Sequence, residues 1–459
     1  MQERQSKMST EFIKDNIPTY LMAAKAEMQG SNLKPFIATD THAERQYHVY
    51  DWYTVGDTFT WTVIAEKPDE FVVTLLIEGF TARVELYCNE QTLSHGINTQ
   101  WDRIQIGKIK LKTGENTISI TSPYPGRGLR FFSIELATES VLADTKKKAD
   151  SLRSDTKWFR DGKYGLQLHW TSHTWPRHGK KKSYDQAITD FDVTSFAKNV
   201  ADMGVGHLIF TTSHAEFYFP APIKAIDDIM PGRTTKRDFV GDLIEALNEY
   251  GIRLMLYYHV GHDHWAEKDG WWDRTGFPVS KEKFKENWCN TMREIGERYG
   301  KGLAGWFYDD GCCFYYPMNP DFEVFTKAAK HGNPDRIVCY NPWIYPRITD
   351  FQDYFCGEGY DCLVDLRFLT SGGNGIFTAG PQEGLQAHSN FLIEDYWLHD
   401  KEDMPISPPR FDKEQFVEDV VNAITHGMVP SINIEVYQDG TFADTSVEYM
   451  MAIKQRVKP

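Results

Sequence analysis

The larger, C-terminal part of the chain alternates apolar, strand-forming runs with amphipathic helical segments, and this alternation limits the fold more than any other feature. The runs YGLQLHW, GHLIFTTSH, RLMLYYHVG and LAGWFYDDG each precede a helical stretch such as KRDFVGDLIEALNEYG. The pattern recurs about eight times, which is typical of a parallel sheet whose strands are joined by helices. No GxGxxG or GxxxxGK[ST] motif follows the first strand, so a doubly wound nucleotide-binding sheet has less support. We therefore expect an α/β fold, with a (β/α)8 TIM-like barrel over residues 161–459.

The N-terminal part has a different rhythm. Short alternating runs such as FTWTVIAEK, FVVTLLIEG and RIQIGKIKL are separated by turn signals such as EKPDE, KTGEN and SPYPGRG. Many short strands at such spacing indicate an antiparallel β-sandwich. We predict an N-terminal segment at 1–37, a β-sandwich accessory domain at 38–140 and a linker helix at 141–160.

Charge and hydropathy exclude several kinds of partner. The formal net charge of −15 argues against nucleic acid or an anionic membrane surface, and no apolar run is long enough to span a membrane. The seven cysteines show no CxxC spacing, and we expect them to be reduced. The start, MQERQSKMSTEF, lacks the apolar stretch of a signal peptide. The compartment therefore stays open: the chain is either cytoplasmic or an exported protein whose signal was removed.

Reactive side chains gather where the predicted strands end. In barrel enzymes the active site lies at the C-terminal ends of the strands. Any one histidine or aspartate there is more often structural, but five strand ends carrying such residues in register favour a site. The candidates are His169, Trp170, His214, Glu216, Tyr257, Tyr258, His259, Trp306, Asp309, Asp310 and Glu358.

Two chemistries could use this set. The spacing of His259, His262 and His264 is compatible with a metal site, because imidazole is a common ligand for Zn²⁺ and Ni²⁺. However, no second histidine pairs with His169 two residues away, as a barrel metallohydrolase would require. Glycoside hydrolysis needs two carboxylates and aromatic side chains around a sugar, which Asp309 or Asp310 with Glu358 would supply. We expect no metal and no other cofactor, and a glycan as the partner.

The barrel segment resembles family 29 α-L-fucosidases. Their first-strand motif FGIFIHWG is similar to YGLQLHW, and LTTKHHDGF is similar to FTTSHAEFY. RDLVGEL…GLYYS resembles RDFVGDL…LYYH, and the nucleophile motif LWFDG resembles GWFYDDG. The resemblance spans about 165–440 and is most specific up to residue 311. It implies a retaining, exo-acting hydrolase that removes terminal α-L-fucose or a related α-L-sugar.

The resemblance also implies roles for particular residues. His169 and His214 would bind sugar hydroxyls, Trp306 would frame the ring, and one of Tyr257 and Tyr258 would lie near the nucleophile. The family's acid/base is a glutamate 40–60 residues after the nucleophile, which points to Glu358.

The choice of nucleophile depends on strand alternation. Side chains alternate between two faces with period two, so Trp306, Tyr308 and Asp310 share one face and Asp309 lies on the other. The family nucleophile directly precedes a glycine and lies on the Trp face. Both criteria predict Asp310, with Asp309 as its rival because GWFYDDG has one residue more than the motif.

Departures from the family pattern leave the substrate open. Ala215 replaces the second histidine of KHHDGF, and Glu216 and Phe217 replace its Asp-Gly. No arginine is evident after the nucleophile strand, although Asn341 or Arg347 could stand near its place. Fucose in an unusual linkage, a modified fucose or L-galactose all fit these changes. A barrel hydrolase of different chemistry, inverting or metal-dependent, and a catalytically inactive sugar-binding relative stay as alternatives.

Overall fold

The computed structural model describes residues 10–37, 46–214, 216–259, 270–276, 280–309, 320–343, 345–359 and 374–457. The chain divides into two compact units. The first contains the residues up to Ser151 with two short later segments, and the second contains the rest. Within the described residues, no helix is long and apolar enough to cross a membrane.

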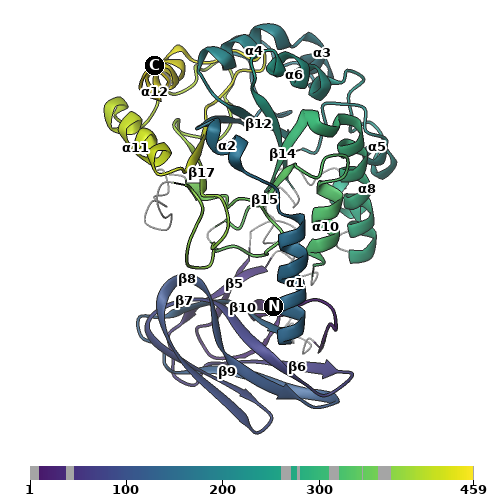
Figure 1. Cartoon of the computed structure of the whole chain (residues 1–459), viewed down its shortest axis with the longest axis vertical. Helices are drawn as coiled ribbons and strands as arrows, with labels where there is room; N and C mark the ends of the chain where they lie inside the picture. Colours follow the sequence, from purple (N-terminus) through teal and green to yellow (C-terminus); the bar gives the residue numbers. More distant parts are fainter. Residues whose placement is uncertain are drawn as a thin grey trace. The chain divides into compact units, whose positions relative to one another are not determined.

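The first unit is a ten-stranded sheet in which neighbouring strands are antiparallel, except that β1 is parallel to β6. Its strands are β1 (Thr10–Phe12), β2 (Thr19–Met22), β3 (Glu27–Gln29), β4 (Lys34–Ile37), β5 (Gln46–Trp52), β6 (Thr58–Ala65), β7 (Asp69–Cys88), β8 (Gln91–Leu111), β9 (Gly114–Tyr124) and β10 (Leu129–Ala137). Figure 1 shows β7 to β10 as long, twisted strands. All ten strands belong to one hydrogen-bonded sheet, so the division into two facing sheets stays a prediction.

The core of this unit comes from alternating strand positions. In β6, Phe59, Trp61 and Val63 are buried, while the residues between them are less so. The Phe59 ring packs edge to face against Trp52 and Phe131, and the Trp61 ring packs edge to face against Phe131, as aromatic pairs prefer. The strands β1 to β4 pair with β5, β6 and β10, so residues 10–37 are part of this sheet and not a segment apart from it.

The second unit contains an eight-stranded, all-parallel sheet in the order β15-β14-β13-β12-β11-β18-β17-β16. The strands are β11 (Gly165–Leu168), β12 (His207–Ser213), β13 (Arg253–His259), β14 (Leu303–Asp309), β15 (Ile337–Tyr340), β16 (Glu358–Gly359), β17 (His388–Leu392) and β18 (Val429–Asn433). The sheet curls, and helices lie on its outside (Figure 1). The predicted α/β class is confirmed. Among the described residues no ladder joins β15 to β16, so closure into a complete barrel stays a prediction.

Local sequence signals set the helix boundaries of this unit. Asp192 and Asp238 each accept a backbone N–H from the third residue on, at 3.0 Å, which caps the helices that follow. The segment predicted as a linker helix contains most of α1 (Glu139–Leu152) and of the short α2 (Lys157–Asp161). The remaining α-helices are α3 (Tyr184–Asp190), α4 (Val193–Asp202), α5 (Lys224–Ile229), α6 (Phe239–Asn248), α7 (Trp271–Thr275), α8 (Lys281–Tyr299), α10 (Phe322–Ala329), α11 (Lys413–Thr425) and α12 (Asp444–Val457).

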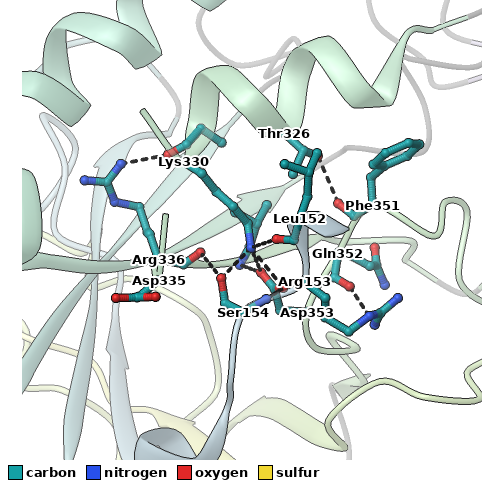
Figure 2. A network of polar contacts seen from close by, with 12 residues as sticks. Leu152, Arg153, Ser154, Thr326, Lys330, Asp335, Arg336, Phe351, Gln352 and Asp353 are labelled. Atoms are coloured by element: carbon teal, nitrogen blue, oxygen red, sulfur yellow. Dashed lines mark hydrogen bonds and ion pairs between the residues drawn. The ribbon is translucent and has the colours of Figure 1, made fainter. Parts of the chain in front are cut away.

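A buried ion pair joins three parts of the second unit (Figure 2). Lys330, directly after α10, lies 2.8 Å from the carboxylate of Asp353, and both side chains are almost fully buried. Lys330 Nζ also donates to the Leu152 carbonyl at 2.6 Å and to Ser154 Oγ. Asp353 accepts the backbone N–H groups of Val338 and Ser154, each at 2.7 Å. Burial lowers the pKa of Lys330, and the Asp353 charge opposes that effect.

We predict that Asp353→Ala lowers the free energy of unfolding by about 3–5 kcal/mol, because it leaves the Lys330 charge buried without its counterion. Denaturant titration measures this loss. Asp161→Ala is the control: its pair with Lys157 is exposed, so removal should cost less than about 1 kcal/mol. Equal losses in the two variants would contradict the role given to the buried pair.

Candidate active site

A cavity of about 170 Å³ lies inside the curled parallel sheet. The strands β11 to β17 each place a residue in its wall, either from the strand itself or from the position just after it. The lining residues are Gln167, His169, His214, Tyr257, Phe307, Asp309, Asn341, Glu358, Asn390 and Trp397. The sheet therefore gathers at one place residues that are far apart in the sequence.

Asp309, the last residue of β14, is held as a carboxylate. Its Oδ2 accepts a hydrogen bond from the Tyr257 hydroxyl, and its Oδ1 accepts one from Asn341 Nδ2 at 2.6 Å. His259 Nε2 lies 3.9 Å from Oδ2. Burial by itself would raise the pKa of Asp309, but the charge of His259 and the two hydrogen bonds outweigh it and lower that pKa.

One amide connects Asp309 to the second acid of the cavity. Asn341 Nδ2 also donates to Glu358 Oε2 at 2.6 Å. An amide nitrogen carries two protons, so it can serve both carboxylates at once. The two accepting oxygens therefore lie no farther apart than twice that bond length.

The hydrogen bonds around His169 hold it as a neutral group. Asn433 Nδ2 donates to the Trp397 carbonyl at 2.9 Å, which turns its Oδ1 toward His169 Nδ1 at 2.8 Å. His169 Nδ1 must then carry the proton, and its Nε2 is an acceptor. Burial, followed by the nearby His214, lowers the pKa of His169 to about 3. The two rings meet edge to face with centroids 5.4 Å apart.

Several predicted site residues face away from the cavity. Trp306 is fully buried and donates from Nε1 to the Ala329 carbonyl of α10 at 3.0 Å. Tyr258 packs against Trp306 and Tyr308, on the same outer side. Trp170 donates to the Gln438 carbonyl at 3.1 Å and packs among phenylalanines.

Trp306, which was predicted to frame a sugar ring, therefore does not line this cavity. In β14 the inward positions are Phe307 and Asp309, and the outward ones are Trp306 and Tyr308. The same alternation puts Tyr257 in the cavity and Tyr258 outside it. Asp310, the predicted nucleophile, lies outside the described residues.

The other candidates are partly placed. Glu216 is half-buried and does not line the cavity. His262 and His264, which with His259 formed the alternative metal site, lie outside the described residues. Among the residues that the structure does describe, no group of three or more His, Cys, Asp or Glu side chains could hold a metal ion.

Sequence reasoning missed four lining residues: Gln167, Phe307, Asn390 and Trp397. A signal existed for Gln167, which is a polar side chain within the otherwise apolar strand GLQL. Gln167 also lies two residues before His169, so it shares its face of β11. Trp397 lies beyond β17, where strand periodicity gives no signal.

Comparison with known protein families gives a match over most of the second unit. The α-L-fucosidase family matches residues 185–457, which is more than half of the chain. The chain belongs to the α-L-fucosidase family. It is therefore a glycoside hydrolase, and the resemblance seen in the sequence motifs is confirmed.

Individual relatives are distant. No curated protein sequence matches the chain. An α-L-fucosidase from Bacteroides thetaiotaomicron is similar in structure, with 18% identity, a TM-score of 0.48 and coverage of 66% of this chain and 74% of that one. AlfC from Lactobacillus casei, solved with α-L-fucose, has 16% identity and a TM-score of 0.46, over 65% and 96% of the two chains.

We predict that Tyr257→Phe raises the pKa of Asp309, because it removes a hydrogen bond that favours the carboxylate. NMR titration of the Asp309 side-chain carbon measures the shift. Tyr258→Phe is the matched control, since that neighbouring hydroxyl lies on the outer side of the sheet. Identical titration curves for wild type and Tyr257→Phe would contradict the prediction.

Proposed function

We propose that this family member is a retaining, exo-acting hydrolase of terminal α-L-fucosyl or related α-L-glycosides, with Asp309 as nucleophile and Glu358 as acid/base. The observation that carries the proposal is the bridge between these two carboxylates through Asn341 Nδ2, with a bond of 2.6 Å to each. We also propose that the curled eight-stranded sheet closes into a (β/α)8 barrel.

The separation of the acids supports retention of configuration. Retaining glycosidases hold their carboxyl groups about 5–5.5 Å apart, and inverting ones about 6.5–9.5 Å apart to admit a water molecule. The shared amide keeps the nearest oxygens of Asp309 and Glu358 within twice 2.6 Å. That limit agrees with the retaining range and is short of the inverting one.

The environment of Asp309 suits a nucleophile, and Glu358 then acts as the acid/base. Asp309 has a lowered pKa, so it is ionised and can attack the anomeric carbon to form a glycosyl ester. Glu358 donates a proton to the leaving oxygen as that bond breaks. It then removes a proton from the water that cleaves the ester, which regenerates both acids.

The remaining lining residues suit one sugar ring. His169 offers a neutral ring nitrogen to a sugar hydroxyl, His214 adds a second imidazole, and Trp397 and Phe307 supply apolar surface. A volume of about 170 Å³ is well below the ~300 Å³ at which pockets for drug-sized ligands begin. This supports exo action on a terminal residue.

We expect Asp309→Asn to lower kcat/KM on an aryl α-L-glycoside by at least ~10³-fold, because the amide cannot form the ester. Steady-state kinetics measure this, and added azide should restore turnover by replacing the missing nucleophile. Asp310→Asn is the matched variant and should retain activity. If Asp310→Asn is the inactive variant and Asp309→Asn is not, the nucleophile assignment is overturned.

Glu358→Gln should affect substrates according to their leaving groups. Without a proton donor, turnover of an alkyl or sugar glycoside should fall by about 10²–10⁴-fold. An activated nitrophenyl glycoside needs less protonation and should show a fast first turnover followed by slow deglycosylation. Stopped-flow kinetics with both substrate types test this, and equal losses for the two would argue against an acid role.

A further inference from the structure

Gln167 brings a buried hydrogen-bond acceptor without a partner to the wall of the active-site cavity. Its side chain is 1% exposed and lines the cavity from β11. Among the described residues, Oε1 accepts no hydrogen bond. A buried acceptor left unpaired costs about 1–3 kcal/mol, so a bound group that donates to it recovers this cost.

The sheet order puts Gln167 across the cavity from the two acids. β11 is separated from β14, which carries Asp309, by β12 and β13. It is separated from β16, which carries Glu358, by β18 and β17. When the anomeric carbon lies between the acids, the opposite end of the ring points toward β11. In a pyranose the ring atom opposite C1 is C4, which is flanked by C3 and C5, and C5 carries the exocyclic C6.

The chemistry at that end distinguishes two closely related sugars. L-Fucose and L-galactose have the same ring configuration and differ only at C6, which is a methyl group in fucose and a hydroxymethyl group in galactose. A methyl group donates no hydrogen bond, whereas the C6 hydroxyl does. The family motif FGIFIHWG has a phenylalanine at the position of Gln167 in YGLQLHW. This chain thus has an acceptor where the motif has an apolar ring.

We propose that Gln167 accepts a hydrogen bond from the exocyclic hydroxyl of the bound sugar, so that the enzyme prefers α-L-galactosides to α-L-fucosides. The inference rests on the proposed function and names its substrate. Gln167 is then a specificity-determining residue, since it contacts the sugar and takes no part in bond cleavage. Sites that bind a substrate hydroxyl strongly reject the analogue that lacks it, because the buried polar group is left unpaired.

The test compares 4-nitrophenyl α-L-galactoside with 4-nitrophenyl α-L-fucoside. We expect wild-type kcat/KM to favour the galactoside by at least ~10-fold. Gln167→Met keeps the length of the side chain and removes the acceptor, so it should lower this ratio by about 10- to 100-fold. Gln352→Met is the matched control: Gln352 is also buried with no side-chain partner among the described residues, but it does not line the cavity. It should leave the ratio unchanged.

The outcomes separate the inference from the proposed function. If the wild type prefers the fucoside, or if Gln167→Met leaves the ratio as it was, the inference is overturned while the hydrolase assignment stands. If neither glycoside is cleaved, the proposed function fails. Calorimetry with free L-galactose and L-fucose then decides the inference, which requires tighter binding of galactose and loss of that difference in Gln167→Met.

Discussion

Almost all described strand residues of the parallel sheet in the second unit are buried, on both faces of the sheet, and this constraint arranges the rest of the unit. Each strand side chain must enter either the interior of the curled sheet or the layer against the helices. In β14 the outer layer takes Trp306 and Tyr308, whose polar atoms contact α10 and α8. The interior takes Phe307 and Asp309. A shift of the strand by one residue would exchange the two sets.

Polar groups in such an interior need partners, because burying them without hydrogen bonds is costly. The Asp309 carboxylate accepts hydrogen bonds from Tyr257 and Asn341, and the side-chain amide of Asn341 also donates one to Glu358. His169 is oriented by Asn433, which is itself oriented by the Trp397 carbonyl. The hydrogen bonds to Asp309 also help to lower its pKa, burial lowers the pKa of His169, and the proposed mechanism depends on both. In this cavity, stability and chemistry therefore depend on the same hydrogen bonds.

Membership of the α-L-fucosidase family leaves the choice of sugar to details of the cavity. Gln167 and Asn390 both add polar groups to the cavity wall. Asn390 lies beside Glu358 in the β16–β17 pair, and the Cys356 thiol donates to its Oδ1 at 3.0 Å. Gln167 Oε1 has no such donor among the described residues. It is therefore the lining residue that we propose accepts a hydrogen bond from a substrate hydroxyl.

The sequence alone determined the α/β class, the family and most of the inward residues at the strand ends. Period-two and helical patterns, together with motifs around His169, His214 and Tyr257, are local properties of the chain. It also pointed to Glu358, although nothing local separates that residue from a surface carboxylate. Only the tertiary structure placed Asp309 in the cavity wall, because the face of a strand is set by what packs on each side of it. Asn341 lies 32 residues from Asp309 and 17 from Glu358, so their shared hydrogen bond exists only once the strands have assembled.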